Sequence, residues 1–184
     1  MRRVAALDLT LPSYPWRDVP MPGATAPLAL TRLDSRPGTF VLHGRFPAGF
    51  ARTVAGGYDA AEEFLVLDGE LEIGGNAFRR GDLTYVPAGY VRGSMRSAAG
   101  CTVLAWFGGA AEFREPESLA APVRDGLVTV PFGTALDLPA ARWLRGRAVP
   151  PDAAGDLVAG DLSAWRRLDG TPVPPDAVVR LEKP

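Results

Sequence analysis

Residues 62–89, EEFLVLDGELEIGGNAFRRGDLTYVPAG, decide the fold of this chain. Apolar, strand-like runs at 63–67 and 70–73 flank Asp68-Gly69, a pair that favours a tight hairpin turn of type I′. A further strand is expected at 83–86, where the following Pro-Ala-Gly stops it. The stretch therefore predicts a hairpin followed by a third short strand.

Short apolar runs and turn residues continue to alternate on both sides of this stretch. The 184 residues include 21 glycines and 18 prolines, and such frequent interruptions suit strands better than a helical bundle. Further strands are expected at 39–46, 91–95 and 101–107. About eight short strands, with turns roughly every 8–12 residues, are typical of a β-sandwich or small barrel, so an all-β fold is predicted.

Three segments are predicted along the chain. Residues 1–26 form a proline-rich N-terminal arm, residues 27–112 hold the strands of the barrel, and residues 113–184 form a C-terminal extension. The extension is expected to be mixed, with strands at 127–132 and 178–181.

A helix is expected over residues 152–168 of the extension. Val158, Leu162, Trp165 and Leu168 follow one helical stripe in this segment.

Composition excludes several classes of protein. The 20 basic and 21 acidic residues give a net charge of −1 with no basic stripe, so no nucleic-acid partner is expected. The longest apolar run, 101–111, is far shorter than the roughly 20 residues of a membrane span, so no membrane partner is expected either. A single cysteine, Cys101, permits no intrachain disulfide, which makes the cytoplasm the expected location.

The stretch from Pro47 to Gly109 resembles the cupin superfamily. Residues 47–71, which begin with Pro47-Ala48-Gly49, look like its first motif, and residues 81–89, GDLTYVPAG, look like its second. The resemblance is nearest to cupins related to anti-sigma sensor domains and to cupin domains of unknown function. It implies an RmlC-like jelly-roll β-barrel, commonly dimeric, with a ligand site inside the barrel mouth.

The sequence departs from the superfamily at its metal ligands. The first motif of the family has His-x-His followed by a Glu, and the second motif supplies another His. Here Glu62 holds the Glu place, while Gly56, Tyr58 and Arg92 stand in the three His places. A guanidinium repels a divalent metal and pairs with a carboxylate. The chain has one histidine in all, so we expect no metal and no cofactor.

Two interpretations of Tyr58, Glu62 and Arg92 stay open. In one, Arg92 and Glu62 form a structural ion pair and Tyr58 packs over it. In the other, the three are the catalytic residues of a ligand site, where Arg92 binds a carboxylate or a developing enolate and Glu62 or Tyr58 moves a proton. The second interpretation predicts a metal-independent cupin that binds a small, anionic organic molecule.

The residues also leave open whether the protein is an enzyme. The enzymatic version is a metal-free isomerase, epimerase or cyclase that works by proton transfer. The alternative is a non-catalytic sensor or scaffold whose pocket is filled by side chains. An open cavity above Tyr58 and Arg92 would favour the first, whereas a plug of Phe64, Tyr90 and Trp106 would favour the second.

Four further side chains are expected to touch the ligand: His43, Phe64, Tyr90 and Trp106. Each has a simpler interpretation. His43 could lie at the surface or rim, Tyr90 could close its loop, and Trp106 could be a core residue.

A homodimer is expected from the face opposite Glu62. Leu65 and Leu67 are apolar there, and an isolated barrel would leave them partly exposed. Two-fold packing of sheet on sheet would cover them.

Overall fold

The computed structural model describes residues 7–10, 15–146, 149–150 and 152–183. These residues form two compact units, one spanning Pro15–Thr129 and the other made of the described residues before it together with Val130 onward. Within the described ranges the regular elements are strands and one short 3-10 helix, η1 (Pro116–Ser118). The all-β prediction is therefore confirmed.

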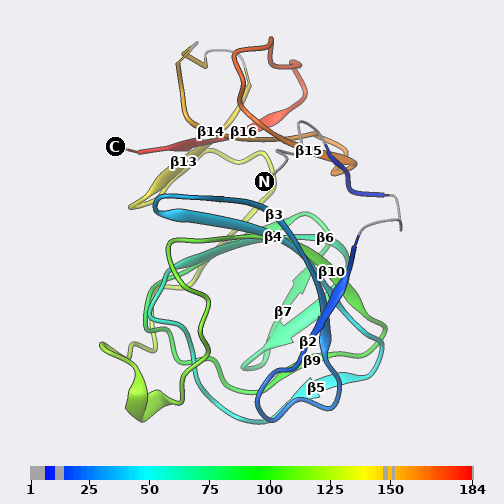
Figure 1. Ribbon diagram of the computed structural model, residues 1–184, viewed down its shortest axis with the longest axis vertical. Coiled ribbons are helices and arrows are strands. Elements are labelled where there is room, and N and C mark those ends of the chain that lie inside the picture. The colour runs from blue at the N-terminus through cyan, green and yellow to red at the C-terminus, as the bar shows by residue number, and fades with distance from the viewer. Residues whose placement is uncertain (1–6, 11–14, 147–148, 151, 184) are drawn as a thin grey trace. The chain divides into compact units, whose positions relative to one another are not determined.

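The unit Pro15–Thr129 is a jelly-roll β-barrel, whose strands curl around a central axis in Figure 1. Ten strands belong to its sheet system, in the order β11-β8-β6-β10-β4-β3-β2 with β5, β7 and β9 paired alongside. They are β2 (Arg17–Val19), β3 (Leu28–Arg36), β4 (Thr39–Phe46), β5 (Phe50–Arg52), β6 (Glu62–Ile73), β7 (Asn76–Arg79), β8 (Asp82–Val86), β9 (Met95–Ser97), β10 (Cys101–Phe107) and β11 (Val128–Pro131).

The unit extends beyond the predicted barrel, 27–112, at both ends. On the N-terminal side, β2 pairs with β3 through Arg17↔Leu30 and Val19↔Leu28, so part of the expected arm is an edge strand. On the C-terminal side, β11 joins the sheet next to β8. The strands expected at 39–46, 101–107 and 127–132 are confirmed, whereas the one expected at 91–95 begins only at Met95.

The hairpin expected at Asp68-Gly69 is wrong. This pair lies inside the twelve-residue strand β6, and the turn comes six residues later, at Gly74-Gly75 between Ile73 and Asn76. Gly69 has φ +75°, and a Cβ there would overlap the Gly100 carbonyl oxygen. The register between β6 and β10 shifts just before this pair and skips Leu67, so β6 has a bulge next to Asp68-Gly69. The bulge lets β6 pair with β8 and β10 at one end and with β7 and β9 at the other.

The barrel core lies on the inner face of these strands. Sixteen buried residues form one apolar cluster, among them Phe64, Val66, Leu71 and Phe107. On β6, Leu65 and Leu67 point to the other face, as the two-residue period of a strand requires. They are nevertheless buried, with 0% and 7% exposure in the single chain. The exposed apolar face that motivated the homodimer is therefore not found, and the dimer stays a prediction.

The second unit is a six-stranded sheet of order β1-β15-β14-β16-β13-β12. Its strands are β1 (Leu7–Asp8), β12 (Leu136–Asp137), β13 (Ala141–Arg145), β14 (Gly155–Val158), β15 (Ala164–Arg167) and β16 (Val178–Glu182). The strand expected at 178–181 is confirmed. In its described residues the extension, 113–184, consists of strands and the short 3-10 helix η1.

The helix expected over 152–168 is wrong. Strands β14 and β15 occupy the segment and pair through Val158↔Trp165. A hairpin also brings these two apolar residues together, so their spacing did not discriminate between the two structures. The glycines do discriminate, because a Cβ at Gly155 or Gly160 would overlap the backbone carbonyls of Arg180 and Asp176. The sheet requires glycine at these close approaches, where a helix would be weakened by it.

Among the described residues, no helix has the length and apolar character needed to cross a membrane.

Candidate functional site

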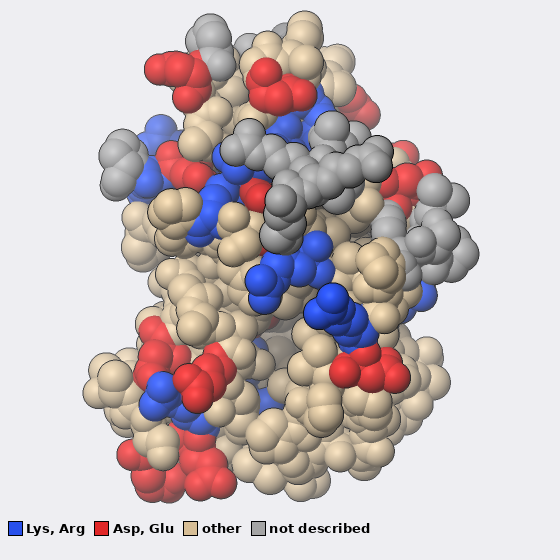
Figure 2. Space-filling view, in the orientation of Figure 1, with Lys and Arg blue, Asp and Glu red and all other residues tan. Residues whose placement is uncertain are grey.

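A cavity of about 260 Å³ lies inside the barrel. The space-filling view shows the barrel hollowed on the face turned to the reader (Figure 2). Among the lining residues only three side chains are polar, Tyr58, Glu62 and Arg92. The rest of the wall is apolar and comes from β2, β3, β4, β6, β9, β10 and two connecting segments: Val19, Pro20, Met21, Pro22, Leu28, Leu30, Leu42, Gly44, Phe46, Phe64, Leu71, Ile73, Met95, Val103, Ala105, Phe107, Ala111 and Phe113.

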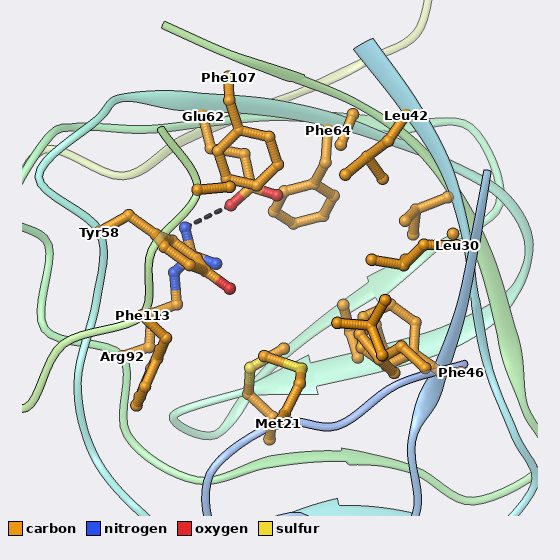
Figure 3. Close-up of a pocket in the computed structure, with 18 of the residues that line it drawn as sticks. Met21, Leu30, Leu42, Phe46, Tyr58, Glu62, Phe64, Arg92, Phe107 and Phe113 are labelled. Atoms are coloured by element: carbon orange, nitrogen blue, oxygen red, sulfur yellow. Dashed lines mark hydrogen bonds and ion pairs between the residues drawn. The ribbon is translucent and has the colours of Figure 1, made fainter. Parts of the chain in front are cut away.

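Glu62 and Arg92 form a buried ion pair at one end of this cavity. Nη2 of Arg92 donates a hydrogen bond to Oε2 of Glu62, as the dashed line in Figure 3 shows. The two side chains are 9% and 6% exposed, Glu62 and Arg92 respectively. Nε of Arg92 has no hydrogen-bond acceptor among the described residues. Arg92 therefore keeps a donor that the pair with Glu62 does not use.

The backbone holds both charged groups in place. Glu62 is the first residue of β6, paired with Val86 and Phe107 on its two sides. Arg92 lies outside the regular strands, but its N–H donates to the Gly56 carbonyl at 2.8 Å and its carbonyl accepts from the Gly56 N–H at 3.0 Å. The site is thus built on hydrogen-bonded backbone on both sides.

Tyr58 packs against the guanidinium of Arg92. Cζ of Arg92 lies 4.6 Å from the centroid of the Tyr58 ring, and the ring of Phe107 meets Tyr58 edge-on at 5.3 Å. Burial raises the pKa of Tyr58 above its ordinary value, although the Arg92 charge opposes the rise. The phenol is therefore neutral at neutral pH. Its hydroxyl points into the cavity in Figure 3.

The side chains present do not fit the metal that the superfamily resemblance implies. Of the four expected ligand places only Glu62 is a metal-binding residue, and its carboxylate is paired with a guanidinium. A side chain at Gly56 has no room, because a Cβ there would overlap the Phe113 ring and the Arg114 carbonyl. No group of three His, Cys, Asp or Glu side chains in the described ranges could hold an ion.

The sequence analysis missed Arg52. This residue ends β5 and is 1% exposed, with its Cζ 4.1 Å from the centroid of the Phe113 ring that lines the cavity. None of its three guanidinium nitrogens has a hydrogen-bond partner among the described residues. Burial lowers the pKa of Arg52 to about 10, so it is still a cation at neutral pH. One signal was available, since Phe50 and Arg52 share a strand face by the two-residue period.

The other predicted ligand contacts divide between the two faces of the sheet. Phe64 lines the cavity, but His43, Tyr90 and Trp106 do not. His43 and Trp106 alternate along β4 and β10 with the lining residues Leu42 and Ala105, so their side chains point to the opposite face. His43 lies there with its ring 5.0 Å from that of Trp16.

Tyr90 packs against the barrel core without reaching the cavity. Its N–H donates to the Pro87 carbonyl, so it closes the loop after β8. The cavity is therefore not plugged by Phe64, Tyr90 and Trp106 together.

Comparison with known proteins supports the fold. No protein-family model and no curated protein matches the sequence. A candidate dioxygenase structure from Nostoc punctiforme is 14% identical, and the match covers 96% of this chain and 81% of that one with a TM-score of 0.57.

Two other solved structures match a smaller part of the chain. The acetylacetone dioxygenase of Acinetobacter johnsonii is 14% identical over 59% of this chain and 78% of that one, with a TM-score of 0.49. An RmlC-like cupin from Shewanella frigidimarina is 18% identical over 53% and 87%, with a TM-score of 0.42. The match to the Nostoc punctiforme structure, the curled antiparallel strands and the two motifs in order together show that the chain has the cupin fold, a jelly-roll β-barrel.

Proposed function

We propose that this protein binds a small organic carboxylate inside the barrel without a metal ion. The observation that carries the proposal is the composition of the cavity wall, where Tyr58, Glu62 and Arg92 are the polar side chains of an otherwise apolar cavity of about 260 Å³. Small-molecule sites combine an apolar wall with a few convergent polar groups in this way. The volume lies slightly below the range of about 300–1,000 Å³ that is usual for drug-sized ligands, so a smaller molecule is favoured.

Each of the polar and apolar parts of the wall would contact a different part of the ligand. Arg92, whose side chain lines the cavity, would donate to a ligand carboxylate while its Nη2 stays with Glu62. The neutral Tyr58 would donate its hydroxyl hydrogen to a second ligand oxygen. The apolar body of the ligand would lie against side chains such as Phe64 and Phe107.

The enzymatic form of the proposal is an isomerase, epimerase or cyclase. The Glu62 carboxylate would accept a proton from the carbon next to the ligand carboxylate, and Arg92 would stabilise the enolate charge that develops on oxygen. Tyr58 would deliver a proton to another ligand atom and recover one from Glu62, so that no proton is gained or lost overall. The alternative, a non-catalytic protein with a filled pocket, is disfavoured by the cavity.

Calorimetric titration tests this proposal. We expect the protein to bind at least one member of a panel of benzoate, phenylacetate, hexanoate and their hydroxylated analogues. Tyr58→Phe is expected to keep binding and to raise the dissociation constant of a bound carboxylate by about two- to tenfold, because it removes one neutral hydrogen bond of about 0.5–1.5 kcal/mol. In D₂O, the proton next to the carboxylate of phenylacetate or hexanoate should exchange, and Glu62→Gln should abolish this exchange because the amide cannot accept a proton. Tyr58→Phe should slow only the later delivery of a proton to the second ligand atom. Failure of every carboxylate to bind would refute the proposal, and binding of phenylacetate and hexanoate without proton exchange would refute its enzymatic form.

The proposal also predicts metal independence. We expect elemental analysis of the purified protein to find no stoichiometric iron, zinc, nickel or manganese, and EDTA to leave the melting temperature unchanged. Arg92 and the missing room at Gly56 are the physical reasons. About one metal ion per chain would contradict this prediction and return the metal-dependent activities to consideration.

We also propose that the protein is a homodimer and that it is cytoplasmic. Light scattering at micromolar concentration should give the mass of a dimer, and a monomer would refute this part. Cell fractionation should recover the protein in the cytoplasmic fraction.

A further inference from the structure

We infer that Arg52 sets the charge of the ligand, and that the barrel selects molecules with a single net negative charge. The inference rests on the proposed function, because it assumes that the cavity holds an organic ligand. It goes further by naming the charge of that ligand and the residue that determines it. Arg52 acts here as a specificity residue and has no catalytic role.

The charges around the cavity do not balance without a ligand. Two guanidiniums, Arg52 and Arg92, and one carboxylate, Glu62, are buried within electrostatic reach of one another. The carboxylate is engaged by Arg92. Tyr58 is neutral, so the buried groups carry a net charge of about +1 at neutral pH. A ligand with one negative charge would neutralise them, whereas a neutral ligand would not.

The surroundings of Arg52 offer its guanidinium no hydrogen-bonded partner among the described residues, although the Glu62 carboxylate attracts its charge. Its three nitrogens have no hydrogen-bond acceptor among the described residues, and its close contact is the face of the Phe113 ring. An aromatic face compensates a buried cation only in part. A buried cation held in this way destabilises the empty protein, and such an arrangement is typical of residues kept for function.

The Phe113 ring separates the guanidinium of Arg52 from the cavity. The same ring lines the cavity and packs against Arg52, and it also meets Tyr58 edge-on at 5.9 Å. In Figure 3 Phe113 lies beside Arg92 at the polar end of the cavity. The Arg52 charge therefore acts on a ligand through the low dielectric of the barrel wall, where electrostatic attraction is stronger than in water.

Arg52→Met tests the inference, with Arg124→Met as the matched control. Arg124 is an exposed arginine of the same unit. We expect Arg52→Met to leave the melting temperature of the ligand-free protein unchanged or to raise it, because an unpaired buried charge is removed. We also expect it to weaken carboxylate binding by about tenfold, and amide binding hardly at all. The ligands are benzoate, phenylacetate and hexanoate, each compared with its primary amide. Arg52→Lys should keep the preference for the carboxylate.

Each outcome separates the inference from the proposed function. If the parent protein binds amides as tightly as carboxylates, the charge preference is overturned and ligand binding in the barrel stands. If Arg52→Met lowers the melting temperature well below that of Arg124→Met, or unfolds the protein, then Arg52 is structural and the inference is overturned, whatever binds. If no carboxylate and no amide binds the parent, both the proposed function and the inference fail.

Discussion

Replacing Arg92 by methionine is expected to weaken carboxylate binding by about a hundredfold, which corresponds to about 2.8 kcal/mol. A hydrogen bond to a charged group contributes about 1.5–3 kcal/mol, and Arg92 is the cation that lines the cavity directly. Titration of the variant with a carboxylate that binds the parent measures this effect.

The same substitution is expected to lower the free energy of unfolding by only about 1–2 kcal/mol. Removing one partner of a sealed buried ion pair typically costs about 3–5 kcal/mol, because the other charge is left unpaired. The Glu62–Arg92 pair borders a cavity of about 260 Å³, so water has room to solvate the remaining carboxylate. Thermal and urea unfolding of Arg92→Met, Glu62→Gln and the double variant measure the cost.

Arg96→Met is the matched control for this experiment. Arg96 also pairs with a glutamate, Glu72, but its side chain is 68% exposed. Because solvent screens this exposed pair, its loss should leave both stability and binding almost unchanged. If Arg92→Met costs 3–5 kcal/mol or more and no carboxylate binds the parent, the pair is structural, and Tyr58, Glu62 and Arg92 are no longer candidates for a site.

His43 is expected to make the protein lose stability as the pH falls from 6.5 to about 4. Burial, with a smaller contribution from the positive charge of Arg45, lowers the pKa of His43 to about 4 in the folded protein. In the unfolded chain it has its ordinary value of 6.5. Between these values the unfolded state binds a proton that the folded state does not, so acid favours unfolding. A shift of this size is worth up to about 3 kcal/mol.

Two measurements check this prediction. His43 is the only histidine of the chain, so its imidazole signals in an NMR titration are unambiguous and should move near pH 4. His43→Gln should flatten the dependence of unfolding free energy on pH between 4.5 and 6.5, leaving the stability loss below pH 4.5 that carboxylates cause. Titration of the folded histidine near pH 6.5 would show that the imidazole takes up protons freely and would contradict the prediction.

The strands of the barrel could be predicted because their signals are local. The run Thr39–Phe46 alternates residues of the two faces and is bounded by turn residues, and the structure has β4 at those positions. The order of the two motifs likewise pointed to the cupin fold. The placement of Tyr58, Glu62 and Arg92 around one cavity followed from the register of these motifs, since residues at equivalent positions of a common fold come together.

Local signals misled where two structures share one pattern. Asp68-Gly69 suits both a hairpin turn and a bulge, and only the pairing of β6 with β10 determines which forms. The stripe that includes Val158 and Trp165 suits both a helix and a hairpin, and the close approach of Gly155 to the backbone of Arg180 excludes the helix. In both cases the deciding contact joins residues that are distant in the sequence.

By itself, the sequence determined the all-β class, the motifs of the fold and the loss of the metal ligands, because each depends on residue type at fixed spacing. Only the tertiary structure decided that the barrel keeps an open cavity, that His43 and Trp106 point away from it, and that Arg52 is buried without a hydrogen-bond partner among the described residues. The reason is physical. Cavity volume, burial and the pairing of charges depend on which side chains meet across the barrel, and spacing along the chain does not specify those meetings.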